Sequence, residues 1–210
     1  SWTEVAEMNS VTAEGYGTGA SSTAILVTNG RNAPYPTLTT NSETWNGSSW
    51  TDTNNTNSTG VMRPLTGTTT AAIATSNYPN STNVETWNGS SWTETTNMSN
   101  YASGGASAGT STEALITRNN KTESWDGSSW TEVAELASAR RSTGNGNNNI
   151  SNNTTALVYG GETDPGGAIV ATTEEWSFPP TTSLALQEGL MWFNSASSAL
   201  KGYGVAGGLP

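Results

Sequence analysis

Cysteine and histidine are both absent from the 210 residues of this chain. Without cysteine, the chain forms no disulfide of its own, and it offers neither a thiol nucleophile nor a thiolate ligand for a metal. Without histidine, it lacks the side chain that serves most often as a general base and as a metal ligand. The sequence therefore predicts a protein that is not an enzyme, with no cofactor and no metal site.

Charged residues make up only 11% of the chain, and the net charge is −10. This negative charge repels nucleic acid and anionic membranes, so we expect neither as a partner. No apolar run approaches the roughly 20 residues that a membrane helix needs, and we expect no membrane insertion. The chain starts at Ser1, inside a repeat and without a methionine, which favours a fragment or a processed product.

Leu, Ile, Val and Phe together make up only 27 of the 210 residues, a share that by itself suggests disorder, but tryptophan recurs at regular intervals. The stretch Glu43–Trp50 reads Glu-Thr-Trp-Asn-Gly-Ser-Ser-Trp, and it recurs as Glu85–Trp92 and, with Asp for Asn, as Glu123–Trp130. Asn-Gly and Asp-Gly between β-prone residues are strong hairpin signals, because both residues tolerate positive φ. We predict that each stretch is a hairpin in which two tryptophans face each other. Packing between sheets is a better interpretation of these pairs than stacking on sugars.

The two ends of the chain each carry half of this repeat. Ser1–Met8 matches the second half, as it stands in Ser129–Leu136, and Glu174–Trp176 matches the first half. Because the halves are complementary, we predict that the ends pair and place Trp2 opposite Trp176. That pairing would close a ring.

The second tryptophans of the four repeats stand at positions 2, 50, 92 and 130, so successive repeats are 48, 42 and 38 residues apart. Periods of roughly 40–50 residues with several short strands are typical of propeller blades. Each repeat also contains a short apolar run beside glycines, such as Ala114–Thr117, which suits a strand buried on both faces. No segment has helical periodicity. We therefore predict an all-β, four-bladed propeller over residues 1–178, closed by pairing of its N- and C-terminal strands.

The fourth repeat has the most informative pattern. It contains Trp130–Leu136, then Ala139-Arg140, then the apolar strand Ala156–Tyr159 followed by Gly160-Gly161, and finally Trp176. This pattern resembles the kelch repeat, which implies a kelch-like β-propeller. The other repeats depart from it, because Asn29-Gly30, Ser76-Asn77 and Asn119-Asn120 replace the Gly-Gly pair and repeats one and three lack the arginine.

Residues 179–210 are expected to be a linker and a C-terminal β-hairpin that turns near Ser195–Ser198, after Pro179-Pro180 has ended the repeats. The pattern Glu-Gly-x-x-Trp-Phe-Asn-Ser, followed by Leu-Lys-x-Tyr, resembles a motif of bacteriophage tail-fibre and other virion structural proteins. A lone hairpin is marginally stable in water, so its apolar side chains need a partner surface. The predicted subunit-contact residues are Leu190, Trp192, Phe193, Leu200 and Tyr203.

The kelch resemblance implies that loops between the second and third strands share a face with loops that lead to the next blade. Tyrosine among Asn, Ser and Gly makes an adaptable polar surface that suits glycans or protein. The alternative, that these loops only connect strands, carries equal weight. The predicted binding residues on this loop face are Tyr35, Arg63, Tyr78, Tyr101, Arg140 and Arg141.

Most acidic residues, Glu43, Glu85 and Glu123 among them, occupy equivalent positions of the repeats, which favours solvated strand faces over a catalytic pair. The loop Gly161–Gly166 contains two acids and could hold Ca²⁺, but such a loop is more often an ordinary turn. The sequence identifies no carboxylate cluster of the kind that a glycan-processing enzyme requires.

The favoured hypothesis is a structural or adhesive module of a phage virion fibre, and therefore an extracellular protein. Its partners would be other fibre subunits, in a homo-oligomer or as tandem beads, together with a host surface glycan. The alternative is an extracellular carbohydrate- or protein-binding propeller of a bacterial surface or filament protein.

Overall fold

The computed structural model describes residues 1–10, 12–32, 34, 36–61, 64–75, 81–102, 104–146, 153–177, 191–194 and 199–202. Every regular element in these residues is a β-strand, so the predicted all-β class is confirmed. The chain divides into two compact units, unit 1 (Ser1–Trp176) and unit 2 (Ser177–Pro210). In the described part of the chain, no helix is long and apolar enough to cross a membrane.

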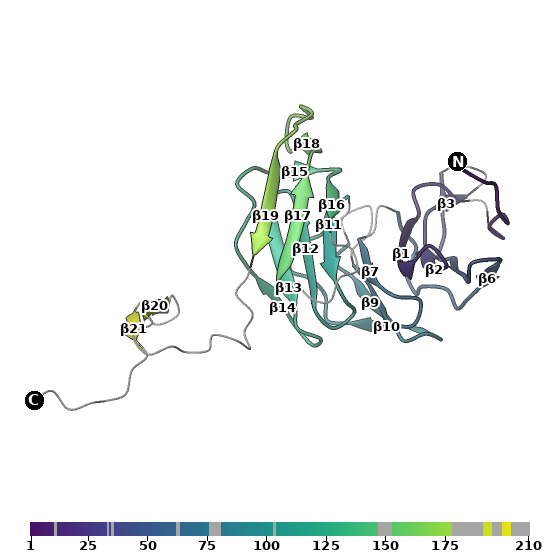
Figure 1. Ribbon diagram of the computed structural model, residues 1–210, viewed down its shortest axis with the longest axis horizontal. Coiled ribbons are helices and arrows are strands. Elements are labelled where there is room, and N and C mark those ends of the chain that lie inside the picture. The colour runs from purple at the N-terminus through teal and green to yellow at the C-terminus, as the bar shows by residue number, and fades with distance from the viewer. Residues whose placement is uncertain are drawn as a thin grey trace, which may run out of the picture. The chain divides into compact units, whose positions relative to one another are not determined.

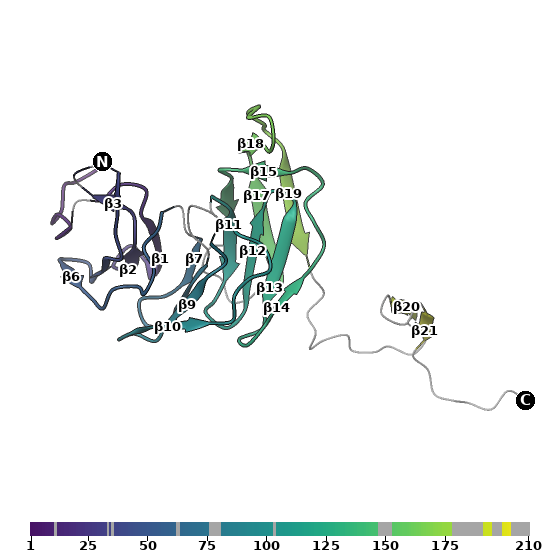
Figure 2. The same ribbon diagram turned by 180° about the vertical axis from the view of Figure 1, so that it is seen from behind.

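Unit 1 contains four antiparallel sheets that follow one another along the chain (Figures 1 and 2). In each sheet the strands neighbour one another in chain order. The first sheet comprises β1 (Tyr16–Ser21), β2 (Ala24–Thr28), β5 (Ser42–Trp45) and β6 (Trp50–Asp52). The second sheet comprises β7 (Leu65–Gly67), β8 (Ala72–Thr75), β9 (Val84–Trp87) and β10 (Trp92–Thr95).

The third sheet comprises β11 (Ala106–Gly109), β12 (Ala114–Arg118), β13 (Lys121–Trp125) and β14 (Trp130–Glu132). The fourth sheet has three strands, β16 (Gly144–Gly146), β17 (Thr155–Tyr159) and β19 (Thr173–Ser177). Two short pairs lie outside these sheets: β3 (Arg31–Asn32) with β4 (Thr37–Leu38), and β15 (Arg140–Arg141) with β18 (Glu162–Thr163). Among the described strands, the fourth sheet thus has no counterpart of the outermost strand of the other three sheets.

The predicted tryptophan hairpins are confirmed. Trp45 pairs with Trp50, Trp87 with Trp92, and Trp125 with Trp130. The ring centroids of the three pairs lie 5.4, 5.3 and 5.0 Å apart. At this distance tilted aromatic rings attract each other beyond the effect of their burial. The repeated Asn-Gly or Asp-Gly turn therefore sets the register of the two outer strands in each of the first three sheets.

The side chain at the start of each turn holds the turn together. The backbone N–H and the hydroxyl of Ser128 donate to Asp126 Oδ1 at 2.8 Å, and the backbone N–H of Ser129 donates to the same atom at 2.8 Å. Asn46 and Asn88 accept equivalent hydrogen bonds through their amide oxygens. The bonds from Ser129 and Ser128 hold the pKa of Asp126 well below its usual range.

This lowered pKa predicts a pH-dependent effect of Asp126→Asn. The ionised carboxylate stabilises the folded state above the pKa of an unfolded aspartate, about 3.9, and this stabilisation is lost as the pH falls through the folded-state pKa. We expect the wild type to exceed the variant in stability at pH 7, and the difference to shrink between pH 4 and pH 2. Urea midpoints measured across this range check the prediction. A difference that stays constant with pH would contradict it.

Neighbouring sheets of unit 1 contact each other through their innermost strands, in the order β1, β7, β11 and β16. Thr18 Oγ1 donates to the carbonyl oxygen of Gly67 at 2.9 Å, and Thr66 Oγ1 donates to that of Gly109 at 2.6 Å. Both glycines have positive φ, and a Cβ at Gly109 would lie 2.0 Å from the carbonyl oxygen of Glu113. Only glycine can therefore occupy this position where one sheet binds the next.

Apolar side chains fill the space between neighbouring sheets in a repeating pattern. Leu26 of the first sheet belongs to a buried cluster with Ala72 and Trp87 of the second. Ile73 of the second sheet packs in the same way with Trp125 of the third. Leu115 of the third packs with Ala156 and Trp176 of the fourth. Each of the first three sheets thus buries one face against the following sheet, as the units of a repeat protein do.

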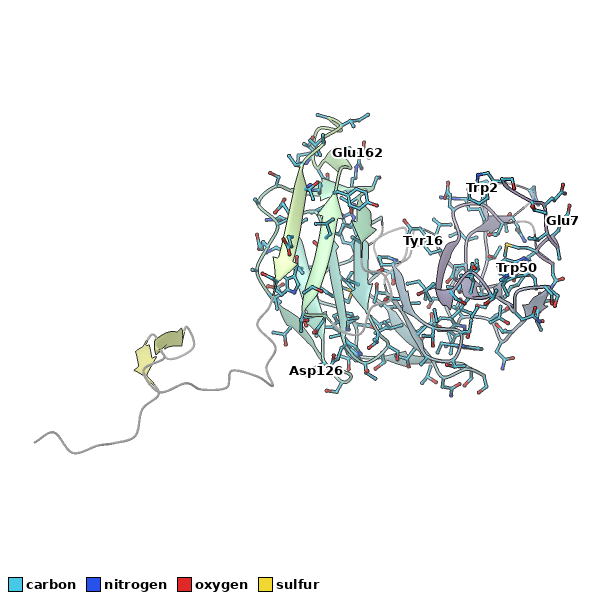
Figure 3. All side chains as sticks on the ribbon, viewed as in Figure 1. Trp2, Glu7, Tyr16, Trp50, Asp126 and Glu162 are labelled. Carbon is cyan, nitrogen blue, oxygen red and sulfur yellow. The ribbon has the colours of Figure 1, made fainter. Side chains whose placement is uncertain are left out.

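The predicted closure of the ring by the two ends of the chain is not observed. Trp2 is fully exposed, with a relative accessibility of 103%, and Ser1–Met8 contains no strand (Figure 3). The backbone N–H groups of Asn9 and Ser10 bind Glu43, which holds this segment beside the first sheet. The N-terminus and β19 lie at opposite ends of unit 1 in both views (Figures 1 and 2). The segment is therefore fixed at the wrong end of unit 1 to pair with β19.

Unit 2 contains a hairpin of β20 (Met191–Asn194) and β21 (Ala199–Gly202), in which Phe193 pairs with Leu200. The hairpin predicted from the C-terminal alternation is therefore present. Leu190 and Tyr203 lie outside the described residues. The proposed role of the hairpin side chains in subunit contact stays a prediction.

Candidate functional site

Three repeated glutamates are buried between the sheets of unit 1. Glu43, Glu85 and Glu123 lie on β5, β9 and β13, each two residues before a tryptophan, and are at most 2% exposed. The expectation of solvated acids on the strand faces is wrong for these three residues. It holds for Glu94 and Glu132, which lie opposite Glu85 and Glu123 on the neighbouring strands and are exposed.

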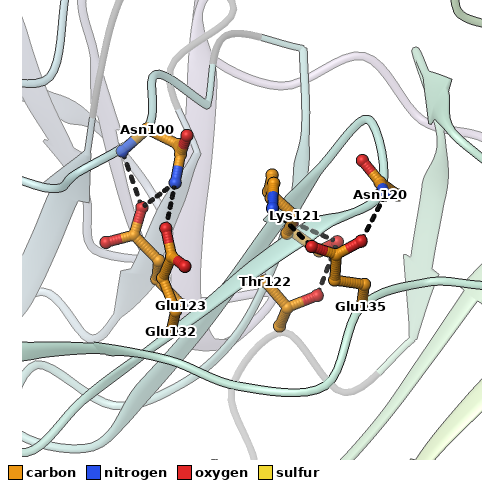
Figure 4. Close-up of polar contacts among 8 residues, drawn as sticks. Asn100, Asn120, Lys121, Thr122, Glu123, Glu132 and Glu135 are labelled. Atoms are coloured by element: carbon orange, nitrogen blue, oxygen red, sulfur yellow. Dashed lines mark hydrogen bonds and ion pairs between the residues drawn. The ribbon is translucent and has the colours of Figure 1, made fainter.

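Each buried carboxylate binds the loop that comes from the preceding outer strand. Glu85 accepts hydrogen bonds from the backbone N–H groups of Asn57 at 2.7 Å and Ser58 at 3.3 Å. Glu123 accepts them from Ser99 at 3.0 Å and from Asn100 at 2.8 Å, and the contact with Asn100 is drawn in Figure 4. We call this arrangement the glutamate clamp. It joins each sheet to the loop that follows the outer strand of the sheet before it.

The first sheet has the same clamp, made with the N-terminal segment of the chain. Glu43 accepts hydrogen bonds from the backbone N–H groups of Asn9 at 2.9 Å and Ser10 at 2.8 Å. Asn9 stands seven residues after Trp2, as Asn57 stands seven after Trp50. Residues 9 and 10 therefore bind the first sheet as the loop after an outer strand binds the second and third sheets.

Arg140 completes the clamp of the fourth sheet, whereas we predicted from the sequence that it binds a ligand on the loop face. Glu174 accepts a hydrogen bond from the backbone N–H of Ala137 at 2.8 Å and forms an ion pair with the Arg140 guanidinium. Arg140 Nη1 also donates to the carbonyl oxygen of Thr172 at 2.9 Å. The side chain of Arg140 is buried. It holds the fourth sheet in place and does not contact solvent, where a ligand would bind.

The clamp is unsuited to acid–base catalysis. Asn100 Nδ2 donates both to the buried Glu123 and to the exposed Glu132, so one amide links the two carboxylates (Figure 4). Glu123 itself has no accessible surface, and its two oxygens accept backbone hydrogen bonds. A general acid or base must reach the substrate, directly or through a water. The geometry of the clamp is therefore structural.

Tyr101, of the predicted loop face, lies beside an arginine that the sequence did not single out. The Arg118 Cζ atom lies 4.3 Å from the centroid of the Tyr101 ring, a cation–π arrangement. Arg118 Nη2 also lies 3.7 Å from Asp164 Oδ2. Arg118 could have been found in the sequence only as the last residue of an apolar strand. The contact fixes the Tyr101 ring in place, half-buried.

Arg141 is the most accessible predicted binding residue in the described part of the chain. Its Nε lies 3.0 Å from Glu162 Oε1, and both side chains are partly exposed. The small hollow beside Tyr101 and Arg118 has space for about one water molecule. A ligand here would bind to an open surface. Tyr35, Arg63 and Tyr78 lie outside the described residues, so their role stays a prediction.

The two carboxylates of the loop Gly161–Gly166, which could hold Ca²⁺, instead face arginine side chains of the protein. Glu162 forms its ion pair with Arg141, and Asp164 lies beside Arg118. Among the described residues, no three acidic side chains are grouped closely enough to hold a metal ion.

Comparison of the chain with protein-family models and with curated proteins found no match.

Proposed function

We propose that this chain is a non-enzymatic structural and adhesive module of a bacteriophage fibre or appendage, built from the blades of a kelch-like β-propeller. One observation carries the proposal. The repeated polar residue of every sheet, Glu43, Glu85, Glu123 or Glu174, binds backbone N–H groups of the preceding loop. The repeated carboxylates therefore join each sheet to the loop before it, and a rigid module needs such fixed contacts between its sheets.

The arrangement of the strands supports the blade interpretation. Each sheet runs in chain order from an innermost strand, and the innermost strands of neighbouring sheets contact each other. Glycines such as Gly67 and Gly109 allow this close approach. A propeller blade has the same strand order, with its innermost strand at the central axis.

The hairpin of β20 and β21 supports a role in assembly. Its pattern around Trp192 resembles a virion structural motif, and two short strands alone are marginally stable in water. We propose that it docks on another fibre subunit. The exposed pair of Arg141 and Glu162, together with Tyr101 from the loop between β10 and β11, is the described part of the surface that we propose for host glycans.

This open polar surface also favours a second candidate, an extracellular carbohydrate- or protein-binding propeller of a bacterial surface or filament protein. Both candidates use the same fold and the same loop face. They differ in the particle that carries the chain, so fractionation distinguishes them.

The test is to locate the chain in its source culture. Virions are purified on a density gradient, and the chain is quantified by mass spectrometry and by gold-labelled antibody, with the major capsid protein as the reference. We expect the chain to band with capsid protein in a fixed ratio and the gold to label the appendages. Recovery in the cell-envelope fraction alone would overturn the virion assignment and favour the second candidate. Release of oligosaccharide from host polysaccharide by the purified chain would overturn the non-enzymatic assignment.

A further inference from the structure

The outward face of the fourth sheet exposes two large apolar side chains among polar ones. In the first three sheets, the side chain that points to the next sheet is buried by that sheet, as Leu115 is by the fourth. Leu157 stands at the equivalent position of the fourth sheet, in the same Ala-Leu sequence, and is 39% exposed. Tyr159, two residues further on the same face, is 45% exposed. Leu157 is therefore exposed at a position where the equivalent side chain, Leu115, is covered by the following sheet.

The outer edge of the fourth sheet is also open. In the third sheet, β13 pairs with β14, and Trp125 lies opposite Trp130. β19 has the equivalent Trp176, but it pairs only with β17 among the described strands. Within the described residues, the fourth sheet therefore has neither an outer strand beside β19 nor a sheet that covers Leu157 and Tyr159.

The opposite end of unit 1 has the complementary features. Ser1–Glu4 has the same sequence as Ser129–Glu132, which includes β14, yet it forms no strand and Trp2 is exposed. Ile25 and Val27 of the first sheet are only partly buried, whereas the equivalent residues of the second and third sheets are fully buried. End sheets of repeat arrays ordinarily present a polar outer face. Here each end instead exposes large apolar side chains, Leu157 and Tyr159 at one end and Trp2 at the other.

We infer that these two ends join separate copies of the chain, head to tail. Ser1–Glu4 of one copy becomes the fourth strand of another copy's fourth sheet, with Trp2 opposite Trp176 and Thr3 opposite Glu175. The first sheet of the incoming copy then covers Leu157 and Tyr159 with Ile25. The new contact continues the three sheet-to-sheet contacts that unit 1 already has, and Asn9 and Ser10 keep their bonds to Glu43.

A second copy fits better than the chain's own N-terminus. The N-terminus and β19 lie at opposite ends of unit 1, so closure within one chain would require all three packed contacts between sheets to change (Figures 1 and 2). A second copy docks without such changes. A head-to-tail contact of this kind gives a closed ring or an open filament, depending on whether the rotation closes. The inference rests on the blade repeat of the proposed function but not on its virion location.

The absence of cysteine allows a direct cross-linking test. Cysteines are introduced into the full chain as Thr3→Cys and Glu175→Cys, because directly paired residues on antiparallel strands lie within disulfide range. After mild oxidation, we expect disulfide-linked dimers and larger species on a non-reducing gel. Mixing the two single variants should give a linked heterodimer. Thr3→Cys with Thr112→Cys, in an exposed turn of the third sheet, is the control and should not cross-link.

Two results would overturn the inference. A cross-link found only within monomers would show that the chain closes on itself, and no cross-link at all would show that the strand does not pair. The virion assignment is unaffected by either result, because it is tested by fractionation.

Mass measurements on variants give an independent test. We expect the wild type to have a multiple of the 21.8 kDa chain mass in light scattering. Trp2→Ala and Leu157→Glu should each shift it to the monomer, with an unchanged circular dichroism spectrum because both side chains are exposed in one copy. A monomeric wild type, or variants that keep the wild-type mass, would overturn the inference.

Discussion

Replacing Trp125 with alanine is expected to lower the free energy of unfolding by about 3–5 kcal/mol, the usual cost of removing a large buried aromatic side chain. Trp125 is 1% exposed, packs on Ile73 of the second sheet and stacks on Trp130. Its Nε1 also donates to the carbonyl oxygen of Ser111 at 3.1 Å. The substitution therefore weakens the sheet and its contact with the neighbouring sheet together.

Urea unfolding followed by far-ultraviolet circular dichroism measures this effect without relying on tryptophan fluorescence. Ile169→Ala is the matched control, because Ile169 is an exposed apolar residue of the same unit, and its loss should change stability by less than about 0.5 kcal/mol. If Trp125→Ala were no more destabilising than the control, the tryptophan pairs would not hold the sheets together.

Glu85→Ala is expected to destabilise unit 1 by about 2 kcal/mol, since the partly buried backbone N–H groups of Asn57 and Ser58 lose their acceptors, at about 1 kcal/mol for each donor, the low end of the range for buried donors. Glu85→Gln keeps one acceptor oxygen and should cost less. The control is Glu94→Ala, which removes the exposed carboxylate opposite Glu85 and should have little effect.

The measurement is the same urea titration for all three variants. The expected order of stability is wild type and Glu94→Ala, then Glu85→Gln, then Glu85→Ala. Equal stability of Glu85→Ala and Glu94→Ala would show that the clamp contributes nothing, in spite of its geometry.

The strand pairing could be predicted from the sequence because its cause is local. The Asn-Gly or Asp-Gly turn between Trp45 and Trp50, and its repeats, define the loop length, and the loop length defines the register. The short apolar runs beside glycine likewise identified buried strands, such as β8 and β12.

The glutamate clamp could not be predicted, because its cause is not local. Charged side chains are rarely buried, so Glu85 was expected on a solvated face. Its burial depends on N–H groups of Asn57 and Ser58, which another sheet's loop supplies. The sequence did contain a signal. In each repeat, a glutamate stands two residues before a tryptophan, and the loop residue that binds this glutamate stands seven residues after the last tryptophan of the preceding repeat.

The loop face and the closure show two further limits. Arg140 matched the kelch pattern, but the pattern did not show that Glu174 and Thr172 would bind its guanidinium. The complementary ends predict that Ser1–Glu4 and β19 pair. Complementarity alone cannot show whether the two strands belong to one chain or to two.

The most direct test of head-to-tail joining is an electron cryo-microscopy map of the assembled protein at side-chain resolution. We expect Trp2 of one copy to lie against Trp176 of the next, with Leu157 and Tyr159 covered by the first sheet of the incoming copy. A map in which Trp2 pairs with Trp176 of its own chain, or in which β19 keeps an open edge in the assembly, would contradict it.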